Sequence, residues 1–372
     1  MDHLVDIIQL INSENIGPIT FYKLIDKFGS AAEALKNLPP KFKPFPRSKA
    51  KLELDLARDK QIQILSYQDV NYPSRLREIP DAPPILYVKG NISLLKHELS
   101  VAVVGSRNAT ITGRKIISKI SYDLTNNDIL VISGMAKGID TAAHKGAMYA
   151  KEQKGPTVAV LGTGVDVIYP SENKELYEQI IAQGVVISEF PIETKAQVQN
   201  FPRRNRLVSA LSLGTLVGEA SINSGSLITS RLALEQGKDV YAIPGNPADS
   251  RSNGSNKLIK EGAILVETVD DILSSITISN NKKIKPFEDY VPKDLFAIPI
   301  DKSEKNVNIR QINENKPIIE LITLDGVERD EIIRASGLDA SEVSMQLLDL
   351  ELSGIIEKKV GNKIALVSLK KK

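Results

Sequence analysis

The chain has 372 residues and an almost balanced charge, with Lys+Arg 48 against Asp+Glu 46 and a formal net charge of +2. The length predicts two or three domains, and 42% hydrophobic and 25% charged residues are typical of a folded globular protein. Cys is 0 and His is 3, which excludes disulfides, thiolate zinc sites, thiol nucleophiles and a histidine-rich metal centre.

The sequence carries no recognisable targeting signal. Its first residues include Asp2 and Asp6 and lack the basic region of a signal peptide. No run of ~18 apolar residues indicates a membrane span. We therefore expect a cytoplasmic protein without a membrane partner. Because the total charge is balanced, any basic surface for nucleic acid has to be local.

Residues 1–60 are predicted to form a small helical domain. Apolar residues recur at helical spacing in Leu4–Ile11 and again from Phe21 to Phe28, with a Gly17-Pro18 turn between them, and a further helix is expected at Lys49–Lys60. Such a pair can be a helix-hairpin-helix whose turn offers backbone N–H groups to a phosphate. A small bundle used for packing or protein contact explains the same pattern, and we favour it.

Residues 61–276 are predicted to form an α/β domain with a doubly wound, mostly parallel sheet. After an irregular, turn-rich entry that ends in the expected strand Ile85–Val88, short apolar runs alternate with Gly-bearing loops and helix-like segments. Continuous apolar strands of this kind are buried on both faces of a parallel sheet. The runs are Val101–Val104, Ile129–Ile132, Thr157–Leu161, Val185–Ile187, Thr215–Val217, Val240–Ile243 and Ile264–Val266.

Residues 277–312 are predicted to be a linker and residues 313–372 a winged-helix domain. Three helical stretches precede a hairpin: Lys316–Leu324, Glu328–Ala335 and Ala340–Leu352, then Ile355–Lys358 and Lys363–Val367. The third stretch and the residue before it are acidic, with Asp339, Glu342, Asp349 and Glu351 and no Lys or Arg between 335 and 357. A helix that enters a DNA groove should not be acidic, so we expect this domain to contact protein rather than duplex DNA.

Several loops that follow the predicted strands contain groups that suit an anion. Gly105-Ser106-Arg107 combines close backbone approach, a hydroxyl and a bidentate cation before a helix. Two glycines flank Lys137, and Ser224-Gly225-Ser226 precedes another helix. Because the carboxyl ends of parallel strands share one edge of a sheet, these loops predict an extended phosphate-binding surface.

The local basic feature is the segment Phe201-Pro202-Arg203-Arg204-Asn205-Arg206. Three Arg beside an aromatic ring suit phosphate pairing and base stacking, whereas a solvated helix start with structural salt bridges is the alternative. The segment is expected to open a helix at Arg206–Leu211, where positive side chains oppose the helix dipole. A compensating anion, either a ligand or a carboxylate, is therefore expected.

The sequence contains few residue patterns that are typical of catalytic or metal-binding sites. Asp140 and His144 stand four residues apart on one predicted helix face, which permits a metal or an acid/base pair. We favour a capping Asp and a structural His. Without a Ser–His–Asp order, paired carboxylates or a ligand cluster, we expect no catalytic residue, no metal and no cofactor.

The motifs resemble those of the bacterial DNA-processing protein A (DprA, or Smf) family. The resemblance rests on residues 103–107, 133–144, 160–170, 188–191, 201–206, 224–229 and 244–246, which agree in order, spacing and content. It is dense over about 60–270 and looser at both ends. Lys137 stands where Arg is common and Met135 where Leu is common. Lys137 can still pair with a phosphate, as a point charge rather than a fork.

The resemblance implies an extended Rossmann domain and a cytoplasmic protein that binds single-stranded DNA. It also implies protection of that DNA from nucleases, help in loading the RecA recombinase during natural transformation and recombination in competent cells, and a homodimer formed through the Rossmann domain. From the family's motifs and the basic segment together, we expect DNA or phosphate binding at Gly105, Ser106, Arg107, Lys137, Phe201, Arg203, Arg204, Asn205, Arg206, Ser224, Gly225 and Ser226.

Two other functions fit parts of the sequence. A Rossmann-type nucleotide-processing enzyme, such as a nucleoside monophosphate phosphoribohydrolase, would need a carboxylate near the glycosidic bond, and Glu219 and Asp140 are the candidates. We favour structural roles for both, because Ser224-Gly225-Ser226 replaces that family's Gly-Gly-x-Gly-Thr loop. An adaptor that acts only through its winged helix would leave the anion-binding loops unexplained.

Overall fold

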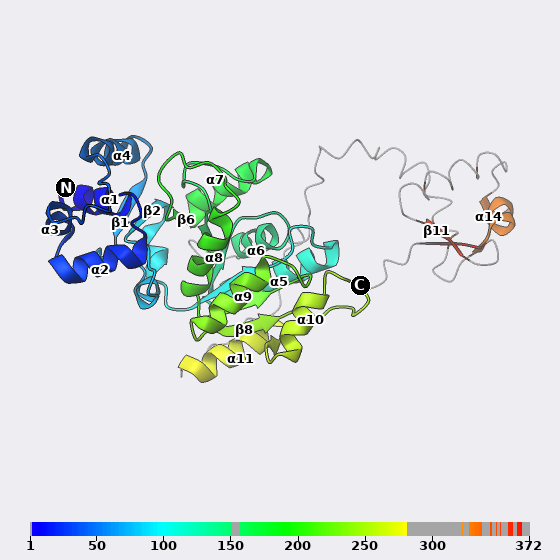
Figure 1. The fold of residues 1–372 in the computed structure, drawn as a ribbon. Helices are drawn as coiled ribbons and strands as arrows, with labels where there is room; N and C mark the ends of the chain where they lie inside the picture. Colours follow the sequence, from blue (N-terminus) through cyan, green and yellow to red (C-terminus); the bar gives the residue numbers. More distant parts are fainter. Residues whose placement is uncertain are drawn as a thin grey trace. The chain divides into compact units, whose positions relative to one another are not determined.

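The computed structural model describes residues 2–150 and 157–280 and, nearer the C-terminus, residues 322, 327–336, 343, 347, 350, 356–359 and 363–366. The chain divides into two compact units, Met1–Phe296 and Ala297–Lys372 (Figure 1). In the described ranges no helix is long and apolar enough to cross a membrane.

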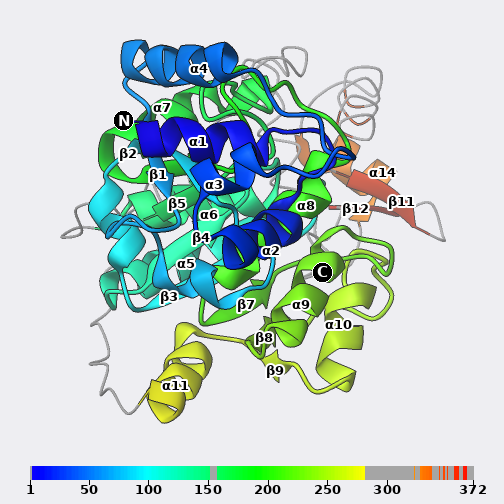
Figure 2. The same ribbon diagram turned by 60° about the vertical axis from the view of Figure 1, so that its left-hand side comes forward.

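The first unit begins with four helices, which confirm the helical character expected for the N-terminal segment. They are α1 (Asp2–Ile11), α2 (Pro18–Phe28), α3 (Ala31–Lys36) and α4 (Arg47–Asp59). Pro18 occupies the first turn of α2, where its missing N–H costs nothing, and Gly29 ends that helix at φ +82°. The helices lie beside β1 and β2 (Figures 1 and 2) and share a hydrophobic core with one face of the sheet.

The sheet has nine strands in the order β1-β2-β6-β5-β4-β3-β7-β8-β9. Their bounds are Gln63–Ser66, Ile85–Gly90, Ser100–Val104, Leu130–Ser133, Thr157–Val160, Val185–Ser188, Gly214–Val217, Asp239–Ala242 and Ile264–Leu265, for β1 to β9. Strands β3 to β9 are parallel, and β2 pairs antiparallel with β6 and β1. The predicted doubly wound α/β fold is confirmed.

Helices cover both faces of this sheet. Val101 and Val103 of β3 pack on one face with α5 (Ile111–Asn126), α6 (Ile139–Met148) and α11 (Val269–Asn280). Ala102 and Val104 pack on the other face with α8 (Asn200–Ala210). The remaining helices are α7 (Lys174–Gln183), α9 (Ser226–Glu235) and α10 (Asn253–Lys260), with short 3₁₀ helices at Ser74–Glu78, Ile92–Lys96 and Ser171–Asn173. Because side chains of β3 alternate between two covered faces, all four residues Val101–Val104 are apolar.

Three boundaries differ from the sequence prediction. Strand β1 lies inside the segment that was expected to be irregular. The sequence did not predict this strand, because a half-exposed edge strand lacks a continuous apolar run. Helix α8 begins at Asn200, not Arg206, so the arginines lie inside the helix. Helix α11 continues to Asn280, past the expected start of the linker at 277, and the linker residues 281–312 lie outside the described residues.

The second unit contains β10 (Val327–Glu328), α14 (Arg329–Ser336), β11 (Ile356–Lys359) and β12 (Lys363–Leu366). The strands form an antiparallel sheet in the order β10-β12-β11, which confirms the predicted hairpin and adds a strand. Ile322, Ile332 and Leu347 contribute to its core. The other predicted helical stretches lie largely outside the described residues, and so do Asp339, Glu342, Asp349 and Glu351.

Candidate nucleic-acid interface

The strand order reverses beside β3. The chain runs from β3 through β4 and β5 to β6 in one direction and then returns to place β7 on the other side of β3. Ligands of open α/β sheets bind outside the carboxyl ends of the strands at such a reversal. Residues 105–110 follow β3 and residues 218–225 follow β7, so both loops leave the sheet at this point.

A pocket of about 420 Å³ lies between these loops and the start of α8. Every predicted site residue except Lys137, Arg203 and Arg206 lines it. The lining residues are Val104, Gly105, Ser106, Arg107, Ala136, Asp140, Tyr169, Val198, Phe201, Pro202, Arg204, Asn205, Ser224, Gly225, Ser226, Ile228 and Thr229. Loops that are far apart in the sequence thus meet at one hollow.

The loop after β3 is held in place by its neighbours. The Ser106 N–H donates to the Glu219 carbonyl over 2.6 Å, and the Ser106 hydroxyl accepts the Asn108 N–H over 3.1 Å. The Arg107 guanidinium carbon lies 5.4 Å from the centroid of the Phe201 ring, in a cation–π contact. Arg107 therefore has a defined position at the pocket.

The loop after β7 brings hydroxyl groups to the start of α9. The Ser224 and Ser226 hydroxyls lie 2.7 Å apart, and the Ser226 N–H donates to the Ser224 hydroxyl over 3.3 Å. The Leu227 and Ile228 N–H groups donate to the carbonyls of Ser224 and Gly225. This end of α9 therefore offers hydroxyls and the positive end of the helix dipole.

Two aromatic rings line the pocket. Phe201 of α8 and Tyr169 have ring centroids 5.4 Å apart, with a tilt of 37° between the rings. A Cβ atom at Gly162 would lie 2.9 Å from the Phe201 ring, so this approach requires glycine. Phe201 is half-buried between Gly162, Tyr169 and Arg107.

The three arginines of the basic segment have different surroundings. The Arg203 side chain is 57% exposed, whereas Arg204 and Arg206 are buried. The expectation that all three would bind DNA treats the segment as a solvated basic face. The Arg206 guanidinium forms salt bridges with two carboxylates, the arrangement that the alternative interpretation describes.

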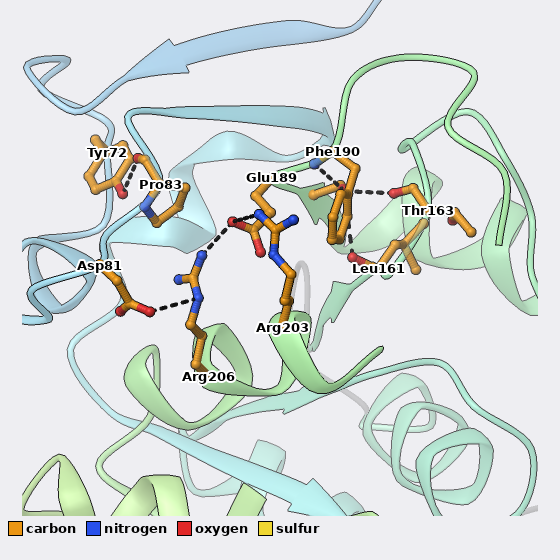
Figure 3. A network of polar contacts seen from close by, with 10 residues as sticks. Tyr72, Asp81, Pro83, Leu161, Thr163, Glu189, Phe190, Arg203 and Arg206 are labelled. Atoms are coloured by element: carbon orange, nitrogen blue, oxygen red, sulfur yellow. Dashed lines mark hydrogen bonds and ion pairs between the residues drawn. The ribbon is translucent and has the colours of Figure 1, made fainter. Parts of the chain in front are cut away.

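Those carboxylates are Glu189, at the end of β6, and Asp81 (Figure 3). Arg206 Nε lies 3.1 Å from Asp81 Oδ2, and Arg206 Nη2 donates to Glu189 Oε2. Arg203 Nη2 lies 3.9 Å from the same Glu189 oxygen and stacks on Phe190. Burial raises the pKa of Glu189, and Arg206 and Arg203 oppose that shift. The compensating anion expected from the sequence is thus supplied within the chain.

Arg204 lies at the pocket with its charge largely desolvated. Its Nη1 donates to the Val160 carbonyl over 2.6 Å, and a Cβ atom at Gly134 would collide with its guanidinium. Burial lowers the pKa of Arg204 to about 10. Nearby Asp140 accepts the N–H groups of Gly134 and Ala136, and burial raises its pKa while Arg204 opposes that shift.

The candidate catalytic groups have structural partners. His144 Nδ1 is hydrogen-bonded to the Thr157 hydroxyl over 2.7 Å, and burial lowers the pKa of His144 to about 3. The Asp140 carboxylate accepts N–H groups of the loop before its helix and is not hydrogen-bonded to His144. The acid/base pair of Asp140 and His144 considered from the sequence therefore does not form. The Glu219 carboxylate accepts the Thr110 N–H over 2.8 Å and the Thr110 hydroxyl. Thr110 in turn caps α5.

Lys137 lies outside the pocket lining. Its Nζ forms an ion pair with Glu172, and this contact lowers the pKa of Glu172. Both side chains are about half exposed. A phosphate that binds Lys137 would compete with Glu172 for it.

Eight residues of the pocket lining were absent from the predicted site, namely Val104, Ala136, Asp140, Tyr169, Val198, Pro202, Ile228 and Thr229. Tyr169 and Val198 are exposed, with exposed fractions of 42% and 88%. The sequence could have indicated Tyr169 as a site residue, because it is an aromatic residue shortly after the Gly162-Thr163-Gly164 loop, which follows strand β5. Val198 has no signal in the sequence, because a valine in a polar segment predicts nothing specific.

The sequence also matches known families and proteins. Residues 63–277 match the family described as DNA recombination-mediator protein A, residues 1–54 the DprA-like N-terminal HHH domain, and residues 312–362 the DprA winged helix domain. DNA processing protein DprA of Streptococcus pneumoniae is 46% identical over 209 residues, which cover 56% of this chain and 72% of that protein.

Solved structures of DNA processing protein A from two bacteria resemble this chain. That of DNA processing protein A from S. pneumoniae has 36% identity and a TM-score of 0.57, covering 70% of this chain and 98% of that one. That of DNA processing protein A from Helicobacter pylori, described for its single-stranded DNA binding mode, has 28% identity and a TM-score of 0.53 over 59% and 97% of the two chains. Together with the sheet order and the three matched segments, these similarities show that the chain belongs to the DNA recombination-mediator protein A (DprA/Smf) family.

Proposed function

We propose that this protein binds single-stranded DNA in the pocket at the carboxyl ends of β3 and β7. The observation that carries the proposal is the meeting of Arg107, the Ser224–Ser226 hydroxyls and the Phe201 ring at one hollow. A cationic groove beside aromatic rings is the usual way to bind single strands without sequence preference. The H. pylori relative, described as binding single-stranded DNA, supports the proposal.

We propose that some of the predicted residues contact the DNA and that others hold the pocket in shape. In our proposal Gly105, Ser106, Arg107, Asn205 and Ser224–Ser226 face the phosphates, and Phe201 lines the part of the pocket that receives the bases. Lys137 and Arg203 extend the path outside the pocket. Arg204 supplies buried positive charge at the pocket, and Arg206 holds α8 through its two carboxylates.

We further propose that the site holds DNA without cleaving it. The two candidate carboxylates for a glycosidic cleavage, Glu219 and Asp140, both accept backbone N–H groups that position loops. Neither is therefore available as an acid or a base without loss of a loop contact. Release of free base from a mononucleotide by the purified protein would contradict this proposal.

The role proposed for the whole protein is that of a cytoplasmic mediator. It protects single-stranded DNA and helps to load RecA during natural transformation and recombination, as a homodimer formed through the Rossmann domain. The family to which the chain belongs supports this role. The lag before RecA assembles on single-stranded DNA, measured with and without the full chain, tests it, and an unchanged lag would contradict it.

The DNA-binding proposal predicts the effect of Arg107→Ala. The substitution removes a charge-assisted phosphate contact, so affinity for a fluorescent single-stranded oligonucleotide should fall about 10-fold. The slope of log affinity against log salt should decrease by roughly 0.7, which corresponds to one phosphate contact on a single strand. Fluorescence anisotropy titrations at several salt concentrations measure both quantities.

The matched control is Arg231→Ala. Arg231 is an exposed arginine on α9 that pairs with Glu235 and does not line the pocket. Its loss should leave affinity and salt slope nearly unchanged. Equal losses for the two variants, or an Arg107 effect confined to one base sequence, would contradict phosphate binding at the pocket.

A further inference from the structure

The Phe201 ring is half-buried, and three other groups of the protein lie against it. The Arg107 guanidinium lies over this ring, Tyr169 lies against it, and the Gly162 backbone approaches it closely. Phe201 is therefore better placed to support other groups than to take a base on its own face.

Tyr169 is more exposed than Phe201. Tyr169 is 42% exposed, it lines the pocket, and in the described part of the chain its hydroxyl has no hydrogen-bond partner. Its ring rests on Phe201, which in turn contacts Arg107. A ring held in this way loses little conformational entropy when a ligand stacks on it. Tyr169 and Phe201 are the two aromatic residues of the pocket lining.

Val198 adds apolar surface to the same pocket. This side chain is 88% exposed and lies in the segment just before α8. Single exposed apolar residues are ordinary, but Val198 and Tyr169 line one hollow that also contains Arg107. A ligand that suits the three groups has a flat apolar part joined to an anion, as a nucleotide of a DNA strand does.

We infer that Tyr169 is the residue on which a nucleobase of bound single-stranded DNA stacks, with Val198 as an apolar wall beside it. The inference rests on the proposed function and assigns its base subsite. Because every base has a π-face, stacking on Tyr169 binds all four bases and gives no sequence readout. The phosphate next to that base would then lie at Arg107.

The first experiment combines a change in the protein with a change in the DNA. Tyr169→Ala should weaken binding of oligo(dT) by about 5- to 150-fold, the range for loss of one stacked base, and Tyr169→Phe should retain most of the affinity. With an abasic oligonucleotide, which keeps its phosphates, Tyr169→Ala should have no further effect. Tyr149→Ala is the control, because Tyr149 is 37% exposed and lies outside the pocket lining.

The second experiment uses the absence of tryptophan from the chain. Tyr169→Trp creates a single fluorophore at the subsite, and Tyr149→Trp creates one elsewhere. Oligo(dT) should quench the Trp emission of the first variant and leave that of the second unchanged, and the abasic strand should quench neither. Circular dichroism checks that each variant is folded.

The outcomes separate this inference from the proposed function. If the wild-type chain binds no single-stranded DNA, both are wrong. If it binds and Arg107→Ala weakens binding, while Tyr169→Ala has no effect and Tyr169→Trp shows no quenching, the base subsite alone is wrong. An equal loss for Tyr169→Ala on oligo(dT) and on the abasic strand would assign Tyr169 to loop structure instead.

Discussion

Arginine side chains a few residues apart differ in how much of their charge is available to a ligand. The Arg203 side chain is 57% exposed, whereas Arg204 is buried and burial lowers its pKa to about 10. Arg107 is positioned by the face of Phe201 rather than by a carboxylate. Counting arginines in the sequence therefore overstates the positive charge of this surface, because Glu189 and Asp81 already neutralise Arg206.

A buried carboxyl outside the pocket lining predicts a pH dependence of stability. Glu53 of α4 is hydrogen-bonded to the hydroxyl of Tyr87 in β2, and burial raises the pKa of Glu53. A raised pKa in the folded state means that folding favours the protonated acid. This stabilisation is complete below the pKa of the unfolded chain and is lost as pH rises through the higher folded value.

Glu53→Gln should therefore be more stable than the wild type at neutral pH, by on the order of 1 kcal/mol. The advantage should disappear in acid, because the wild-type group is then neutral as well. Urea unfolding at a series of pH values measures this difference. A stability difference that does not change with pH would show that the Glu53 carboxyl is not the group responsible.

At the scale of elements, α8 connects the pocket to the sheet. It carries Phe201 at its start, and Arg206 one turn later fastens it to Glu189 at the end of β6 (Figure 3). Pro202 lies in the first turn, where a proline is tolerated, so α8 extends upstream of the predicted start at Arg206.

Removal of Glu189 should be far more costly than removal of its exposed neighbour. Glu189→Ala leaves the buried Arg206 with Asp81 alone, and breaking a buried ion pair costs roughly 3–5 kcal/mol of unfolding free energy. Arg203→Ala removes a mostly exposed partner at 3.9 Å and should cost under about 1 kcal/mol. Denaturant unfolding compares the two variants, and similar losses would mean that Arg206 does not depend on Glu189.

At the scale of the whole molecule, β9 is an edge strand of the sheet. Within the described residues β9 pairs with β8 alone, and Leu265 on this strand is 43% exposed. Edge strands with exposed apolar residues readily pair with another chain. The proposed homodimer through the Rossmann domain would cover this edge.

Leu265→Glu should therefore shift the full chain from a two-chain mass toward a one-chain mass, because a charge at a buried interface is strongly unfavourable. Light scattering coupled to size-exclusion chromatography gives the mass. Leu52→Glu is the matched control, since Leu52 is 56% exposed on α4. A one-chain mass for the wild type, or equal effects of the two substitutions, would contradict this edge as the interface.

The sequence by itself determined the doubly wound sheet, the hairpin near the C-terminus and the two loops with Arg107 and Ser224–Ser226. Burial on both faces forces the parallel strands to be continuous apolar runs, and their loops meet at one edge. Only the tertiary structure decided which arginines are exposed and that Tyr169 rests on Phe201. Whether a charged or aromatic side chain faces a ligand depends on partners distant in sequence, such as Glu189 for Arg206, and no local pattern records them.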